Sequence, residues 1–490
     1  MGIPYYFYTI TKRHAGIVSA SATRACDLLF LDYNGIIHQA VRQALSASGE
    51  KTKEAALFDS IWRYTEDVVS RVNPTRTYIC IDGVAPKAKM IQQRKRRYLT
   101  QLRSRMIGQP VAWDTNAISP GTGFMTRLAA YLANKVTSDF VLSSAAEPGE
   151  GEHKMFAMLA DIPTDQRVTI YGLDADLIML SMLSGRKQIT LMREMSQPGA
   201  AGAAVEFQYL DVDPLVTAVV KDAGVDIQTY IVLCFLLGND FIPNISALHL
   251  KDAGIDVLLA ACKTVTMNGQ MQLVQDGEIH MEVLGRILQE LARDENTRML
   301  ERNDDYIRRR PYSQPHLDAI HCYPLQPENK DPVAHAISAN PGKWRSLYYK
   351  HLFQTSLQDT RLIHIACREY IRGIQWTLAY YTRKPIDNDW YYPYGYAPTL
   401  ADLANYALTS DSSSDIVKTS IDFVPPLVQL LAILPPQSAA LVPGKWMTDA
   451  RMSHLYPTSF KLQTYLKHAF HECHPILPML DFGLIHRLTT

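Results

Sequence analysis

Seven acidic residues of this chain stand at or just beyond the ends of apolar runs. They are Asp32, Asp82, Glu150, Glu152, Asp174, Asp176 and Asp240. Crowding these carboxylates into one crevice is unfavourable unless cations lie among them. Oxygen ligands suit Mg²⁺ or Mn²⁺, and two such ions about 3.5–4 Å apart can stabilise the attacking and leaving oxygens of an in-line displacement. The pattern therefore predicts a phosphodiester-hydrolysing site with two Mg²⁺ ions, with Mn²⁺ as the alternative.

Each acid taken singly has an ordinary structural alternative, because acidic residues that follow strands often cap helices or form turns. The seven together favour a shared site. Asp174 and Asp176 are two residues apart and can point to the same side of an extended backbone, and Glu150 and Glu152 have the same spacing.

The elements that would position these acids are short apolar runs separated by amphipathic sequence, which is typical of a parallel α/β sheet. We predict buried strands at residues 27–32, 77–82, 139–144 and 168–173. Strand ends in such a sheet open onto a common crevice. The predicted fold class is α/β, with a mostly parallel central sheet flanked by helices and a mainly helical C-terminal region packed on it.

Three regions are predicted along the chain. They are a catalytic α/β region at 1–255, a hairpin, helix and connector at 256–343, and a mainly helical second region at 344–490. The hairpin is expected at 265–273 around Asn268-Gly269, and the helix at about 281–293. Loops are expected at 198–204 and 409–415, and the connector at 308–343.

A strongly basic segment follows the second predicted strand. Between Asp82 and Trp113 the chain has eight Lys or Arg residues and no acidic residue. If this segment is helical, one side of it could hold a terminal phosphate by charge-assisted hydrogen bonds. That side carries Lys89, Gln93, Arg96 and Arg97. A solvated helix face is the ordinary alternative for such a charge run.

Aromatic rings near a basic groove can stack on the bases of a single strand. His38, six residues after Asp32, could supply one ring, and Trp376 or Trp390 a second. A core position is the ordinary alternative for each of them. The group His468, His471, Cys473 and His474 matches no standard zinc spacing, so we expect packing or surface roles for it.

Composition narrows the class of protein. The chain has 490 residues, 47% of them hydrophobic, and a formal net charge of zero, so a nucleic-acid partner must be held by a local basic patch. Seven scattered cysteines without a CxxC pair indicate reduced thiols and a cytoplasmic or nuclear location. No apolar run reaches the ~20 residues that span a bilayer, so no membrane association is expected.

Taken together, the motifs resemble those of the Xrn-type 5′→3′ exoribonucleases, a branch of the flap-endonuclease superfamily with its PIN-like fold. The matching stretches in the first half are MGIPYYFYTITKRH, LDYNGIIH, IDGVAPKAKMIQQRKRRY, NAISPGTGFM, EPGEGEHKMF, YGLDADLIMLSM and LLGNDFIPN. Those in the second half are YIRGIQWTLAYY, WYYPYGYAPTLADL, PLVQLLAILPP and LYPTSFKL. The resemblance covers nearly the whole chain.

The resemblance implies a role for each of these groups. It makes the seven acids metal ligands, the four side chains of the basic segment a pocket for a 5′-monophosphate, and His38 with one of the two tryptophans a stacking pair for the first bases. It implies that residues 2–6 form part of a wall that admits only an unpaired strand. The implied activity is Mg²⁺-dependent degradation of 5′-monophosphorylated single-stranded RNA, one nucleoside 5′-monophosphate at a time.

Two other functions compete with this expectation. A flap-type DNA nuclease would share the acidic site, but the QQRKRR cluster follows the RNA enzymes, and LLGNDFIPN is not followed by a glycine-rich helix-hairpin-helix. An inactive RNA-binding or virion protein on a nuclease fold would not need all seven acids. The short segment before SPGTGFM, and the end of the chain soon after the second region, favour a compact member of viral origin. The sequence leaves the protein partners unknown.

Overall fold

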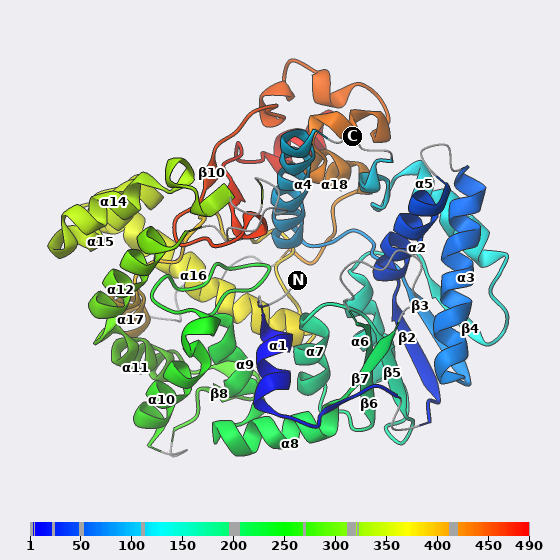
Figure 1. Cartoon of the computed structure of the whole chain (residues 1–490), viewed down its shortest axis with the longest axis horizontal. Coiled ribbons are helices and arrows are strands. Elements are labelled where there is room, and N and C mark those ends of the chain that lie inside the picture. Colours follow the sequence, from blue (N-terminus) through cyan, green and yellow to red (C-terminus); the bar gives the residue numbers. More distant parts are fainter. Residues whose placement is uncertain are drawn as a thin grey trace.

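The structure is a computed structural model, and it describes residues 3, 5–21, 25–48, 53–108, 113–195, 206–267, 271–310, 320, 323–410 and 420–489. It contains a seven-stranded sheet with the order β1-β7-β6-β5-β2-β3-β4, which lies in the right-hand half of the view in Figure 1. The predicted strands are β2 (Leu28–Asp32), β3 (Arg76–Cys80), β4 (Phe140–Ser143) and β5 (Val168–Tyr171). These four pair in parallel, which confirms the predicted sheet.

Three strands of the sheet were not predicted from the sequence. β6 (Ile189–Glu194) pairs in parallel with β5, whereas β7 (Phe207–Asp211) and the two-residue β1 (Val18–Ser19) run antiparallel at that edge. β6 and β7 flank residues 196–205, which lie outside the described part of the chain together with the predicted loop at 198–204.

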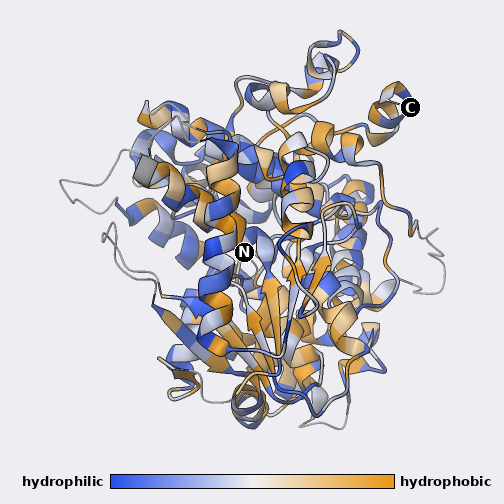
Figure 2. Ribbon diagram, turned by 90° about the vertical axis from the view of Figure 1, so that its right-hand side faces the viewer, coloured by the Kyte–Doolittle hydropathy of each residue, from blue (hydrophilic) through white to orange (hydrophobic). Residues whose placement is uncertain are grey.

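Helices cover both faces of the sheet because successive strand residues point to opposite sides. Leu29 and Leu31 pack against α2 (Tyr33–Ser48), α3 (Glu54–Val72) and α5 (Gly123–Ala133). Phe30, between them in sequence, packs on the other face. That face is covered by α6 (Gly151–Ala160), α7 (Asp176–Leu183), α8 (Val212–Ala223) and α9 (Ile227–Phe235). Figure 2 shows the strands as mainly hydrophobic ribbons between these two layers.

The second half of the chain is mainly helical, as predicted. Its helices are α10 (Gly254–Thr266), α11 (Met281–Ala292), α12 (Glu295–Arg308), α14 (Pro332–Ala339), α15 (Trp344–Tyr348), α16 (Thr360–Tyr381), α17 (Leu400–Thr409), α18 (Pro426–Ile433) and α19 (Phe482–Thr489). α16 reaches the sheet layer and contacts α7 and α9 (Figure 1). One hydrophobic cluster runs from Phe30 of β2 to Tyr465, across both predicted region boundaries, so those boundaries stay a prediction.

The region between residues 256 and 343 differs from the expectation in two places. The hairpin lies several residues later in the chain than predicted. It is formed by β8 (Val274–Gln275) and β9 (Glu278–Ile279). Its turn residues, Asp276 and Gly277, have positive φ angles of 53° and 71°, the conformation that two-residue hairpins favour. Asn268-Gly269 lies outside the described residues.

The predicted connector at 308–343 contains α14, whose first turn is capped by the Asp331 side chain accepting from Val333 N. The predicted helix at 281–293 is confirmed as α11. Most of the predicted loop at 409–415 lies outside the described residues. None of the helices in the described part of the chain is long and apolar enough to cross a membrane.

Candidate active site

The predicted acids lie along the carboxyl edge of the parallel strands, which the strand order brings together. Asp32 is the last residue of β2, and Asp82 stands two residues beyond β3. Glu150 is the N-cap of α6, and Glu152 lies in its first turn. Asp174 and Asp176 stand where β5 leads into α7, and Asp240 follows α9. Acids from five separate places in the chain therefore lie along this edge.

Direct contacts bring Asp32 and Asp82 to the start of α6. Gly151 N donates a hydrogen bond of 2.7 Å to Asp82 Oδ1, and Asn34 Nδ2 donates one of 2.8 Å to Asp82 Oδ2. A Cβ at position 151 would lie 3.3 Å from Asp82 Oδ1, 3.5 Å from Asp32 Oδ1 and 2.8 Å from the carbonyl oxygen of Cys80. Glycine therefore lets the backbone of α6 approach both carboxylates closely.

The ammonium of Lys89 lies between two of the other acids. This residue is on α4 (Lys87–Ile107), and its Nζ is 2.8 Å from Glu150 Oε2 and 3.0 Å from Asp240 Oδ2. The two carboxylates are 5% and 4% exposed. Lys89, expected in the phosphate pocket, thus also neutralises the acidic edge in this structure. Such a buried pair is held by Coulomb attraction against a large desolvation cost.

The electrostatics of the acids show how closely they crowd. Burial, followed by the charges of Asp82 and Asp174, raises the pKa of Asp32 well above its usual range. Burial and then Glu150 raise the pKa of Asp82. Burial, with Asp240 as the largest acidic neighbour, raises the pKa of Asp176 to about 6. Burial is the largest cause of each shift, and the charges of neighbouring carboxylates add to it.

The donor set suits a hard divalent cation, since it consists of carboxylate oxygens in mutual repulsion. Across the described ranges, however, no three His, Cys, Asp or Glu side chains are arranged to close around one ion. The Lys89 ammonium already stands between Glu150 and Asp240. A bound ion would therefore need carboxylates to turn towards it, and the identity of that ion stays a prediction. In the described part of the chain, His468, His471, Cys473 and His474 are likewise not arranged around one ion position.

Two tyrosines that the sequence did not single out contact the acids. The hydroxyl of Tyr380 donates to Glu150 Oε1, and that of Tyr381 donates a 2.7 Å hydrogen bond to Asp176 Oδ1. Both lie in the last turn of α16 and are buried. Their only signal in the sequence is the YY pair that ends YIRGIQWTLAYY. The second region of the chain thus orients carboxylates of the first.

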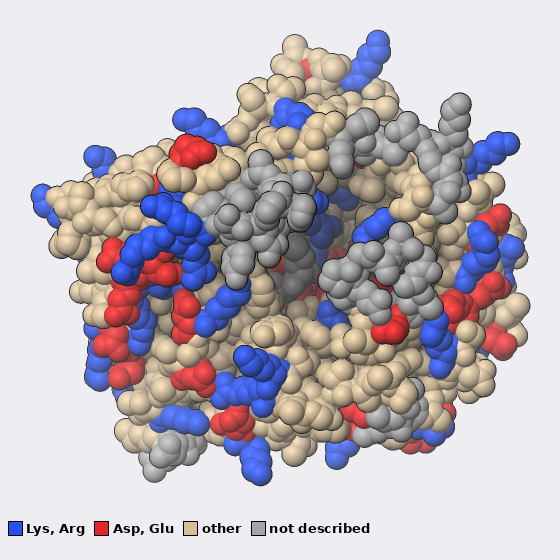
Figure 3. Space-filling view, viewed as in Figure 1, with Lys and Arg blue, Asp and Glu red and all other residues tan. Residues whose placement is uncertain are grey.

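The predicted phosphate-binding side chains occupy α4 as expected. Gln93 is buried, and Arg97 donates from Nη1 to Asn116 Oδ1 at 3.0 Å. Gln93 Oε1 and Arg97 Nε are buried and have no hydrogen-bond partner among the described residues. Burial and then the charges of Arg96 and Arg97 lower the pKa of His38 to about 4, so this ring lies beside both guanidiniums and is neutral near pH 7. Figure 3 shows this face hollowed near its middle, with basic and acidic side chains inside.

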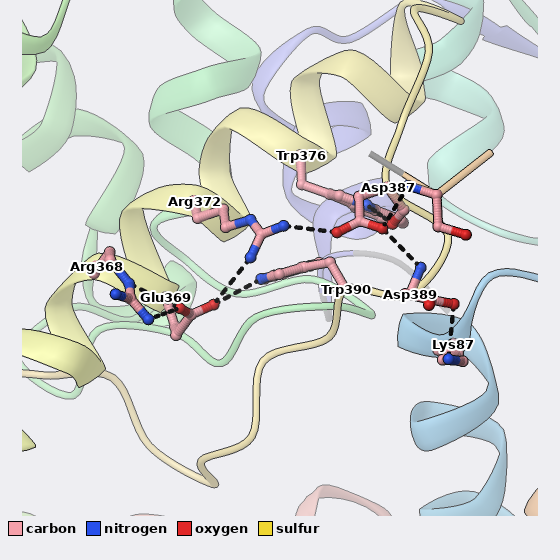
Figure 4. Close-up of polar contacts among 9 residues, drawn as sticks. Lys87, Arg368, Glu369, Arg372, Trp376, Asp387, Asp389 and Trp390 are labelled. Carbon is pink, nitrogen blue, oxygen red and sulfur yellow. Dashed lines mark hydrogen bonds and ion pairs between the residues drawn. The ribbon is translucent and has the colours of Figure 1, made fainter. Parts of the chain in front are cut away.

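The two candidate tryptophans lie together in an aromatic cluster (Figure 4). Their ring centroids are 5.2 Å apart, and only 5% of Trp376 and 3% of Trp390 is exposed. Trp376 Nε1 donates to the carbonyl of Asp387 at 2.8 Å, and Trp390 Nε1 donates to Glu369 Oε2 at 3.1 Å. Both rings are packed as core residues are, which agrees with the ordinary alternative for them. A role for either ring in stacking on RNA bases stays a prediction.

The same cluster ties α16 to α4. Arg372 Nη2 lies 2.6 Å from Asp387 Oδ2, and two residues further on Asp389 pairs with Lys87 Nζ at 2.7 Å (Figure 4). Lys87 is the first residue of α4 and stands two residues before Lys89. The loop after α16 therefore holds the end of α4 that carries the proposed phosphate-binding side chains.

Comparison with known proteins gives two matching family models. Residues 1–195 match a model described as the XRN 5′-3′ exonuclease N-terminus. Residues 221–319 and 326–485 match a model described as the Xrn1 helical domain. The break between the two models falls within residues 196–220, after β6.

Curated relatives match along nearly the whole chain. The chain is 24% identical to 5′-3′ exoribonuclease 1 of Schizosaccharomyces pombe and 25% identical to that of Homo sapiens, in each case over 98% of its length. It is 24% identical to the 5′-3′ exoribonuclease 2 homolog of Caenorhabditis elegans. It spans 48%, 33% and 70% of these relatives, respectively. Among solved structures, a bacteriophage T5 flap endonuclease in complex with DNA and metal ions aligns with a TM-score of 0.31 and 11% identity. The alignment covers 56% of this chain and 91% of that one. This likeness is too weak to carry an argument.

Proposed function

The chain belongs to the XRN 5′-3′ exonuclease family, and on that premise we propose that it is a 5′→3′ exoribonuclease. Its substrate is single-stranded RNA with a 5′-monophosphate, which it degrades to nucleoside 5′-monophosphates. The observation that carries the proposal is the crowding of the acidic edge against α4, where Lys89 touches Glu150 and Asp240. Phosphodiester hydrolysis needs a cation site and a phosphate-binding site side by side, and this contact supports both.

The acidic side chains suit the proposed chemistry. A pair of Mg²⁺ ions, when bound, supplies an activated water and charge compensation for the leaving 3′ oxygen. The carboxylates of Asp32, Asp82, Glu150, Glu152, Asp174, Asp176 and Asp240 would hold these ions. Tyr380 and Tyr381 fix the orientation of two of the carboxylates through their hydroxyls. Mn²⁺ remains the alternative ion.

The basic side chains suit recognition of the RNA end. Gln93, Arg96 and Arg97, with Lys89, offer charge-assisted hydrogen bonds to one terminal phosphate. Burial and then the charge of Arg96 lower the pKa of Arg97 to about 9. Among the described residues Arg97 forms no ion pair, so a bound phosphate would give it an anionic partner. A cap or a triphosphate is larger and would be excluded. The neutral ring of His38 next to them can stack on the first base.

The proposal is tested with RNA ends of defined chemistry. The protein is incubated with the same single-stranded RNA carrying a 5′-monophosphate, a 5′-triphosphate or a 5′-hydroxyl, in Mg²⁺, in Mn²⁺ or in EDTA. We expect nucleoside 5′-monophosphates from the monophosphorylated RNA alone, and only with a divalent ion. Equal decay of all three RNAs would remove the phosphate pocket from the proposal. If none of the three RNAs decays, the exoribonuclease activity is excluded. A DNA flap is offered as a fourth substrate, and its cleavage instead of the RNAs would favour the flap-type alternative.

A further inference from the structure

A cavity lies along α4, next to the acidic edge. Its volume is about 520 Å³, and it lies between α4, the 237–250 segment after α9 and residues 465–474 near the end of the chain. Asp240 and Arg96 line one side of it. The cavity therefore adjoins the proposed reaction site.

The walls of this cavity carry an excess of positive charge. Lys95, Arg96, Arg103, Arg302 and Lys467 line it, together with three histidines. The two carboxylates in its wall are already engaged, since Asp240 pairs with Lys89, and Glu472 accepts from the hydroxyl of Tyr5 and from the backbone N of His468. Arg302 is also engaged, since it pairs with Asp252. Among the described residues, no carboxylate forms an ion pair with Lys95, Arg96, Arg103 or Lys467.

Lys95 and Lys467 form the core of this cationic group, and the uncharged ring of His474 lines the same wall. Burial, followed by the charges of Lys467 and Arg94, lowers the pKa of Lys95 to about 8. Burial, then Lys467 and Lys95, lowers the pKa of His474 as well. Neither lysine makes an ion pair within the described ranges. Like charges held together away from water destabilise a fold unless an anion lies among them.

Polar side chains also line this space, among them Gln92, Thr100, Asn239 and Asn244. Amide and hydroxyl groups of this kind can donate to and accept from the base and ribose of a nucleoside.

We propose that this cavity is a second nucleotide site that binds a free nucleoside 5′-monophosphate. Lys95, Lys467 and His474 receive the phosphate, while the aromatic walls, which include Tyr391 and Tyr394, face the nucleoside. The identity of the nucleotide rests on the proposed function, since the reaction releases this compound beside Asp240. Cations for a phosphomonoester, polar side chains for a base or ribose, and aromatic faces occur together here, and a simple anion would need only the first.

The test is isothermal titration calorimetry of the full chain in EDTA, with adenosine 5′-monophosphate, adenosine and inorganic phosphate as separate ligands. We expect wild type to bind two molecules of the nucleotide, one in the proposed phosphate pocket that includes Arg97 and one in the cavity. Lys95→Gln and Lys467→Gln should each weaken one of the two by about ten- to a hundredfold, the effect of losing a charge-assisted hydrogen bond. Arg97→Gln should weaken the other.

Two matched controls accompany these variants. Lys95→Arg keeps the charge and should keep both sites, which separates loss of binding from loss of folding. Arg105→Gln removes a cation of the same helix that donates to Thr458 O outside the cavity and should change neither site. Unchanged binding by both glutamine variants, adenosine binding as tightly as its monophosphate, or inorganic phosphate binding as tightly as the nucleotide would each overturn the proposal. None of these readouts uses RNA cleavage, so failure of the proposed function would be seen separately.

Discussion

Replacing Lys89 by methionine should destabilise the metal-free protein and make its stability strongly dependent on Mg²⁺. Methionine is close to the lysine stem in volume, so the change removes mainly the ammonium that lies 2.8 Å from Glu150 Oε2 and 3.0 Å from Asp240 Oδ2. At an effective dielectric constant of about 20, each pair attracts by roughly 5–6 kcal/mol, against which desolvation takes several kcal/mol. Loss of one partner of a buried ion pair typically costs about 3–5 kcal/mol, and we expect a loss of that size in EDTA.

Mg²⁺ should offset this loss because it supplies the missing positive charge among the same carboxylates. A ligand at a hundred times its dissociation constant stabilises a fold by about 2.7 kcal/mol. Wild type must move the Lys89 ammonium aside to bind an ion at this position, so its own gain should be smaller. The difference in unfolding free energy between wild type and Lys89→Met should therefore shrink as Mg²⁺ is added.

The measurement is urea unfolding followed by tryptophan fluorescence, in EDTA and across a series of Mg²⁺ concentrations. Lys330→Met is the matched control, because Lys330 is also buried but donates to the carbonyls of Tyr306 and Arg309, remote from the acids. Its loss of stability should not respond to Mg²⁺. A constant or widening gap for Lys89→Met would refute the idea that the ammonium and a divalent ion compete for one place.

Four further predictions follow from single contacts. Asp176→Asn should lower RNA cleavage at least about a hundredfold in a gel assay while leaving RNA binding measurable, and retained turnover would remove this residue from the metal site. Tyr381→Phe deletes the hydroxyl that contacts Asp176 and should raise the half-saturating Mg²⁺ concentration about tenfold, whereas an unchanged Mg²⁺ titration would argue for packing alone. Arg97→Gln should reduce the rate on 5′-monophosphorylated RNA by about ten- to a hundredfold and spare 5′-hydroxyl RNA, so an equal loss on both would contradict a phosphate contact. Burial raises the pKa of Glu295 from 4.5 to about 7, so this group lowers the stability of wild type as pH rises from 4.5 to 7, and Glu295→Gln should lose about 3 kcal/mol less across that window in urea unfolding.

The sequence was sufficient to predict the four parallel strands β2 to β5 and the position of the acids at or after strand ends, because both are encoded locally. A run such as DLLFLD specifies a buried strand by its apolar residues and ends in the acid that the strand delivers to the sheet edge. Strands at the antiparallel edge, β6 and β7, escaped prediction because they carry no acid of the site and frame the glycine- and alanine-rich segment. The hairpin was misplaced because Asn-Gly and Asp-Gly are equally good turn sequences a few residues apart.

Only the tertiary structure decided which side chains meet. Lys89 and Asp240 are 151 residues apart, Tyr380 and Glu150 are 230 apart, and no local pattern links either pair. The burial of Trp376 and Trp390 against each other likewise depends on how α16 packs, since their spacing in the sequence is as compatible with an open stacking surface as with a core. The sequence alone determined the strands and the acids at their ends, because the apolar pattern that specifies a strand lies within a few neighbouring residues. Which side chains contact one another was decided by the packing of distant elements. A buried contact is stable only when several elements together exclude water from it, and no single segment can do that.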